Sequence, residues 1–147
     1  MAVCEAQLLD SFLEQYDWIS KRDREDRWLT GWEGEDRSYP LAIQLSDTWI
    51  SFQVSPFLKL GLDWESWPEI SHFLLELNHL SHMAKLSIDS QGDIHLSLEV
   101  FTSSIDYDKF CDTLGVLAYY ADFFYNEILN KMDHVGFRYS EALNFLA

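Results

Sequence analysis

Several residue types are scarce in this chain of 147 residues, and each scarcity excludes a class of protein. The two cysteines, Cys4 and Cys111, are far apart and lack the spacing of a CxxC motif or a metal site, which predicts free thiols and no bound metal. With six glycines and no phosphate-binding or hydrolase motif, no cofactor is expected. No apolar run approaches the roughly 18 residues of a membrane-spanning helix, and the N-terminal residues lack the features of a signal peptide. We therefore expect a cytoplasmic protein without a membrane partner.

Basic residues are also few, because 10 Lys and Arg stand against 25 Asp and Glu, which gives a net charge of −15. Such a charge repels nucleic acids and anionic membranes and favours basic partners. The hydrophobic content of 48% is ordinary for a globular protein, and the aromatic residues are dense, with 10 Phe, 7 Tyr and 6 Trp. The length and composition predict a single domain over residues 1–147, with a C-terminal extension over about 132–147.

The stretch 74–100 organises the chain, because the spacing of its apolar residues changes partway along. Up to Leu80 they recur as in an amphipathic helix, and from Leu86 to Val100 they alternate as in strands. Gly92 separates the two alternating runs at a turn position that suits a positive φ. A capping box, Ser66 to Glu69, is expected to start the helix. The pattern predicts a helix followed by a β-hairpin.

The same reasoning assigns the other elements of the chain. Spacing predicts a helix over 3–18, strands within 28–32, 41–45 and 48–54, and a long helix over about 106–131. The charged run 21–27 is interpreted as a solvated linker, and Pro56 is expected to end the third strand. These elements predict an α+β fold: an antiparallel sheet of about five strands with helices mainly on one face, in the order α-β-β-β-α-β-β-α.

The long helix carries two apolar stripes, whereas an ordinary surface helix carries one. Residues from Phe110 to Ile128 form the stripe that faces the core, and a second stripe on nearly the opposite face consists of Val116, Tyr119, Tyr120 and Phe123. The second stripe needs a cover, which the C-terminal residues, the segment 57–65 or another chain could provide. A two-fold homodimer is the expected cover, because one patch then serves both partners.

Two further groups of residues have competing interpretations. Trp28, Trp32 and Trp49 either close the core or form exposed anchors for a partner on the uncovered face of the sheet. His79 and His82 lie three residues apart near a helix end, where histidines are favoured by the helix dipole; the alternative is a catalytic site with nearby carboxylates. No catalytic residue is assigned.

The second half of the chain holds three short motifs: Leu77-Asn78-His79-Leu80, then Lys85-Leu86-Ser87-Ile88-Asp89 before Gly92, and Ala121-Asp122 followed by aromatic residues. These motifs resemble the YbjN family, which has a type III secretion chaperone-like fold. The resemblance covers about residues 66–130. It implies a small, acidic, often dimeric protein that binds other proteins and has no known reaction.

The leading prediction for function is a non-enzymatic protein-binding module, chaperone-like or regulatory, whose client the sequence does not identify. One alternative is an acidic mimic that occupies a basic, nucleic-acid-binding partner. A second alternative is a small enzyme that uses His79, His82 and nearby carboxylates. Salt separates the first two, because a mimic should release its partner steeply as its charges are screened.

Overall fold

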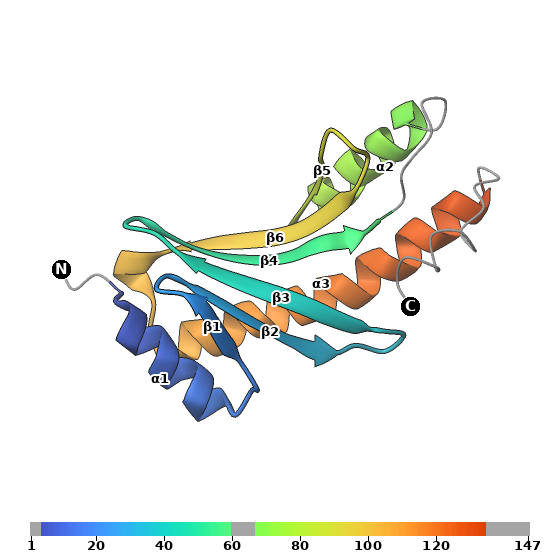
Figure 1. The fold of residues 1–147 in the computed structure, drawn as a ribbon. Helices are drawn as coiled ribbons and strands as arrows, with labels where there is room; N and C mark the ends of the chain where they lie inside the picture. Colours follow the sequence, from blue (N-terminus) through green and yellow to red (C-terminus); the bar gives the residue numbers. More distant parts are fainter. Residues whose placement is uncertain (1–3, 60–66, 135–147) are drawn as a thin grey trace.

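The computed structural model describes residues 4–59 and 67–134. Within these ranges the elements follow the predicted order, with one strand added before the first predicted strand (Figure 1). The elements are α1 (Ala6–Tyr16), β1 (Lys21–Arg24), β2 (Arg27–Glu33), β3 (Ser38–Leu45), β4 (Trp49–Leu58), α2 (Trp67–Leu80), β5 (Lys85–Ile88), β6 (Ile94–Phe101), the short 3-10 helix η1 (Thr102–Ser104) and α3 (Tyr107–His134).

The strands form one antiparallel sheet in the order β1-β2-β3-β4-β6-β5. This confirms the predicted α+β fold, with six strands in place of about five. The helices α1 and α3 pack on one face, and Figure 1 shows α3 crossing behind the sheet. The other helix, α2, lies against β5 at the edge of the sheet. The face away from α1 and α3 is hereafter the outer face.

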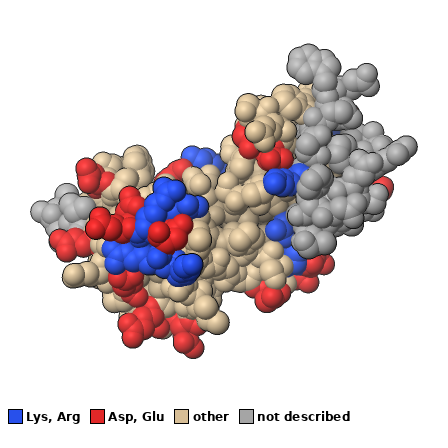
Figure 2. Space-filling model, viewed as in Figure 1, with Lys and Arg blue, Asp and Glu red and all other residues tan. Residues whose placement is uncertain are grey.

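The added strand, β1, occupies the charged run that was interpreted as a linker, so that interpretation is wrong. All four of its side chains are exposed, and its backbone pairs with β2. A strand at the edge of a sheet needs backbone pairing on one side only, and charged side chains there hinder pairing with another chain. Figure 2 shows basic and acidic side chains mixed over this end of the sheet, beside an uncharged band across its middle.

Pro56 does not end β4, which continues to Leu58. The register between β4 and β6 shifts between Val54 and Leu58, so the proline sits in an irregular part of the ladder. Proline lacks an N–H, and strands tolerate it at such irregularities. Beyond the shift, Phe57 and Leu58 are fully buried, so the start of the segment 57–65 belongs to the core.

The core lies between the sheet and the helices α1 and α3. In β4 the alternate residues Ile50, Phe52 and Val54 are fully buried, as the period-two pattern predicted. Phe110 of α3 is also fully buried and lies 5.4 Å, between ring centroids, from Phe12 of α1. The core therefore ties the N-terminal helix to the last helix across one face of the sheet.

The last helix is close to its predicted range. The Asp106 carboxylate accepts a hydrogen bond from the Lys109 N–H at 2.8 Å and so caps its N-terminus. The helix continues past residue 131 to His134, and Met132 is fully buried. Residues 135–147 and Ser66 of the predicted capping box lie outside the described residues.

Polar side chains from the motifs that resemble the YbjN family hold the sheet at two places. The Asn78 amide of α2 pairs with both backbone groups of Leu86 in β5: the Leu86 N–H donates to Oδ1 at 2.7 Å, and Nδ2 donates to the Leu86 carbonyl at 3.0 Å. The Asp122 carboxylate of α3 accepts a hydrogen bond from the Glu35 N–H at 3.1 Å, beside the turn between β2 and β3. A Cβ on Gly34 would lie 2.6 Å from that carboxylate, so only glycine permits this approach.

Candidate functional site

The three tryptophans proposed as exposed anchors do not share a surface. Trp28 is only 1% exposed, and its indole N–H donates to the Asp10 carboxylate at 2.7 Å beneath α1. Trp32 is half-buried on the same side of the sheet and stacks on Trp18 with ring centroids 6.0 Å apart. Trp49 lies on the outer face, where it is 44% exposed. Of these three, only Trp49 offers an aromatic surface to a partner.

Trp49 stacks on Phe101, with ring centroids 4.5 Å apart. The register of β4 and β6 places the two residues directly opposite each other at one end of the sheet. Phe101 is 52% exposed. The pair forms a small apolar patch on the outer face.

The second stripe of α3 is partly covered within the chain. The Tyr120 hydroxyl accepts a hydrogen bond from the His82 N–H at 2.9 Å, and its ring stacks on Phe124. Phe123 is half-buried, whereas Tyr119 is 64% exposed and lies parallel to the Phe123 ring. The stripe therefore presents mainly Tyr119 to solvent, and Val116 at its N-terminal end belongs to a cavity.

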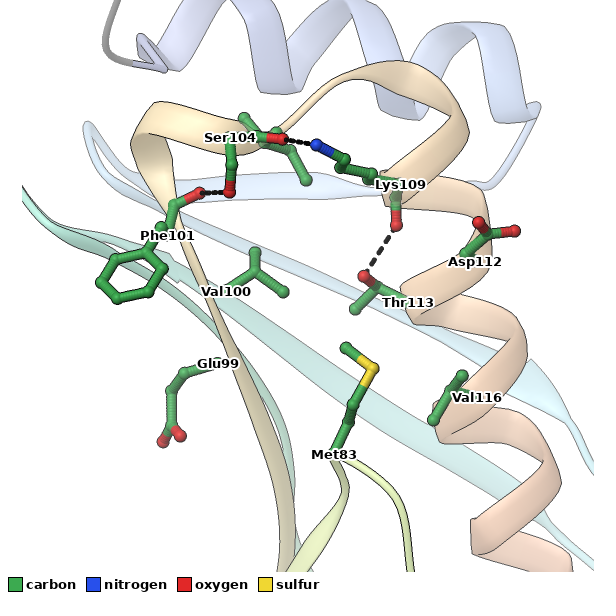
Figure 3. Close-up of a pocket in the computed structure, with 10 residues that line it drawn as sticks. Met83, Glu99, Val100, Phe101, Ser104, Lys109, Asp112, Thr113 and Val116 are labelled. Carbon is green, nitrogen blue, oxygen red and sulfur yellow. Dashed lines mark hydrogen bonds between the residues drawn. The ribbon is translucent and has the colours of Figure 1, made fainter.

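That cavity, hereafter the Met83 groove, has a volume of about 400 Å³. It lies between the end of β6, η1, the first turns of α3, and Met83 on the connection from α2 to β5 (Figure 3). Its apolar lining comes from Met83, Val100, Phe101, Ile105 and Val116. Figure 3 shows the Met83 side chain extending from its connection into the gap between β6 and α3, with Val116 on the α3 side. The groove thus combines an apolar lining with an open side.

Met83 has an unusual backbone conformation for its residue type. Its φ is +70°, in the left-handed region where glycine is favoured, and a side chain there costs ~1–2 kcal/mol. The side chain is nevertheless 60% exposed, so it recovers little of this cost by burial. Strained residues of this kind cluster at ligand clamps, and methionine is a flexible side chain common at adaptable binding surfaces.

The charged residues of the groove differ in how well they are paired. The Lys85 ammonium donates to both carboxylate oxygens of Glu99 at 2.8 and 2.9 Å. Lys109 donates to the Ser104 carbonyl at 2.8 Å. Asp112 is exposed and makes no hydrogen bond or ion pair with any other described residue. An unpaired negative charge therefore stands at the rim of the groove.

Three side chains on the outer face form a hydrogen-bonded network that the spacing of residues in the sequence did not predict. His95 Nδ1 is 2.6 Å from the Ser55 hydroxyl, and His95 Nε2 is 2.8 Å from the Asp89 carboxylate. None of these three residues lines the Met83 groove. Asp89 also accepts hydrogen bonds from the N–H groups of Gln91 and Asp93 in the turn between β5 and β6. This side-chain network joins β4 to the β5–β6 hairpin, so its role is structural.

The Asp89 bonds predict a pH-dependent stability. The hydrogen bonds from His95 and then from the turn lower the pKa of the Asp89 carboxyl below its ordinary value. Because the folded pKa is depressed, the stabilisation is complete above about pH 4 and is lost as the pH falls through the folded pKa. We expect Asp89→Asn to lower the unfolding free energy at pH 6 and to have a smaller effect at pH 3, as measured by urea unfolding.

The matched control is Asp47→Asn, which removes an exposed carboxylate from the turn between β3 and β4. The two variants lose the same charge, so general charge effects are shared. An Asp89→Asn effect that is equal at both pH values would contradict the assigned role of this carboxylate.

The histidines of the enzyme alternative do not form a site. His79 and His82 are both exposed, and neither side chain bonds to a carboxylate of the described residues. Among residues 4–59 and 67–134, no group of three or more His, Cys, Asp and Glu side chains could hold a metal ion. In the same ranges, no helix has the length and apolar character needed to cross a membrane.

Comparison with known proteins places the fold. No protein-family model matches the chain, and no curated protein matches its sequence. YbjN of E. coli is 13% identical, with 92% of this chain and 96% of YbjN covered at a TM-score of 0.62. The structure of the ExsC–ExsE complex matches at 14% identity, with 80% of this chain and 88% of that chain covered at a TM-score of 0.56. The chain has a YbjN-like, type III secretion chaperone-like fold.

An uncharacterized protein from Methanothermobacter thermautotrophicus is also similar, at 14% identity, with 87% of this chain and 96% of that chain covered and a TM-score of 0.55. Identities this low show the fold alone. The comparisons therefore confirm the predicted YbjN-like fold. Any function of the Met83 groove has to be argued from the geometry of the groove itself.

Proposed function

We propose that this protein is a non-enzymatic protein-binding module, chaperone-like or regulatory, that receives an apolar side chain of a partner in the Met83 groove. The observation that carries the proposal is an open apolar cavity of about 400 Å³ with the exposed Met83 at its mouth. Cavities of about 300–1,000 Å³ with mostly apolar linings are typical of binding sites. The solved complex of ExsC with ExsE adds support, because a chain of this fold there has a protein partner.

The unpaired thiols of Cys4 and Cys111 suit a reducing compartment, and we propose a cytoplasmic location. The acidic-mimic alternative rests on the net charge of −15 and needs no groove. It differs in its salt response, because binding by apolar anchors survives the screening that releases a purely electrostatic complex.

The test is selection of binders from a random library of 12-residue peptides on the full-length protein. We expect enriched peptides that bind the wild type at 0.5 M salt and bind Val116→Gln at least tenfold more weakly, because glutamine puts a polar group into the apolar lining. Ile19→Ala, at a residue that is 96% exposed and does not line the groove, is the control and should not change affinity. No enriched peptide, or peptides that depend on Ile19 and not on Val116, would contradict the proposal.

We also propose that the protein forms a two-fold homodimer through Tyr119 and Phe123 of α3. Tyr119 is exposed and stacks on Phe123, so a second copy could cover both rings. Tyr119→Asp should shift the sedimentation coefficient of the full chain from dimer to monomer, with unchanged circular dichroism. Gln91→Asp is the control, since it adds the same charge at an exposed position in the turn between β5 and β6, away from this face of α3. A wild-type monomer at 100 µM would contradict this proposal.

A further inference from the structure

Resting on the proposed function, we infer that the Met83 groove selects a segment in which an apolar side chain is next to a lysine or arginine. The apolar side chain enters between Met83 and Val116, and the basic side chain pairs with Asp112 at the rim. The partner is therefore a protein with a short apolar and basic segment, and not any protein with an exposed apolar residue.

The size and shape of the groove support one anchor. Its volume of about 400 Å³ is near the lower end of the range for ligand sites, which suits a single large side chain. Val100 and Ile105 form apolar walls on the side of β6 and η1, and Val116 forms the wall on α3. The flexible Met83 side chain enters from the α2–β5 connection, where it can close over anchors of different shape (Figure 3).

The backbone of Met83 supports a binding role over a structural one. A glycine would adopt a φ of +70° without strain, so stability alone does not explain a methionine at this position. The 60% exposure of the side chain also means that it adds little to the core. Both observations fit a side chain whose contacts are completed by a partner.

Asp112 and the net charge of the chain together favour a basic partner. Glu99 pairs with Lys85, and the Lys109 ammonium keeps its positive charge but donates to the Ser104 carbonyl, whereas Asp112 has no partner among the described residues. The whole chain carries a net charge of −15, which attracts a basic segment and repels an acidic one.

The peptides from the library selection test the inference directly. We expect most enriched sequences to contain a large apolar residue with Lys or Arg beside it. Replacing that basic residue by Glu in the strongest peptide should weaken binding by about tenfold at 50 mM salt. Asp112→Asn should weaken binding of the original peptide about two- to fivefold, the range of an exposed ion pair.

Two controls make this result specific. Asp133→Asn removes an exposed carboxylate about 31 Å further along the same helix and should leave the affinity unchanged. Asp112→Lys should restore binding of the Glu-substituted peptide, since the charges are then exchanged across the same contact. Met83→Gly should weaken binding about tenfold while the melting temperature is unchanged or higher, because glycine relieves the backbone strain.

The inference and the proposed function fail in different ways. Enriched peptides that depend on Val116 but lack a basic residue, or whose affinity ignores Asp112, would overturn the inference and leave the proposed function standing. A loss of melting temperature in Met83→Gly would also overturn the role assigned to Met83. An absence of any enriched peptide would overturn both.

Discussion

Phe110→Ala is expected to lower the free energy of unfolding by about 3–5 kcal/mol, the range measured for buried phenylalanines. Phe110 is fully buried near the N-terminus of α3, and its ring contacts side chains from two other elements. Ring centroids lie 5.4 Å away for Phe12 of α1 and 6.1 Å away for Phe52 of β4. Truncation would leave a cavity at the junction of both helices with the sheet.

Urea unfolding monitored by tryptophan fluorescence measures this loss. Tyr119→Ala is the matched control, because it removes a ring from the same helix at a position that is 64% exposed. Its cost should stay within about 1 kcal/mol. Hydrogen exchange should also accelerate in α1 more than in β4, since α1 loses a principal contact. Equal costs for the two variants would contradict the placement of Phe110 in the core.

In the strands, the sequence predicted which residues share a face but not which element covers that face. The alternation in β4 predicted Ile50 and Phe52 as buried and Trp49 on the other face, and the structure agrees. Alternation also grouped Trp28 with Trp32, which do share a face. It could not show that α1 covers Trp28, because alternation places residues on a face but does not indicate which element packs against that face. β1 left no apolar signal, because all its side chains are exposed.

The Met83 groove could not be predicted from the sequence, for a different reason. Its residues come from separate stretches of the chain, and a left-handed methionine has no sequence signature like that of glycine. Val116 was recognised as part of a surplus apolar stripe, although its neighbours across the groove were not. The hydrogen-bonded network of Ser55, His95 and Asp89 was also not predicted, since β4 and β6, whose pairing brings Ser55 to His95, are distant in sequence.

The motifs that resemble the YbjN family act in the structure as connections. Asn78 joins α2 to β5, Asp89 holds the turn between β5 and β6, and Asp122 contacts the turn between β2 and β3. Each carries a polar side chain that satisfies backbone N–H groups, and none of the three lines the groove. This explains why the resemblance predicted the fold correctly and supplied no residue of the candidate site.

Asn78→Ala is expected to lower the free energy of unfolding by about 2–4 kcal/mol, because it leaves two backbone groups of Leu86 without a partner. The Leu86 N–H and carbonyl bond to the Asn78 side chain at 2.7 and 3.0 Å, and the Leu86 residue is only 5% exposed. β5 is the last strand of the sheet, so these groups lie on its free edge. Uncovering such an edge also favours pairing between chains.

Urea unfolding should show the loss of stability, and light scattering at elevated temperature should show increased association. Asn126→Ala is the matched control, because Asn126 is exposed on α3, and its cost should stay within about 0.5 kcal/mol. Asn78→Asp keeps an acceptor for the Leu86 N–H but loses the donor to the carbonyl, so it should also destabilise the fold at pH 7. If Asn78→Ala and Asn126→Ala unfold at the same urea concentration, then Asn78 does not hold this edge of the sheet.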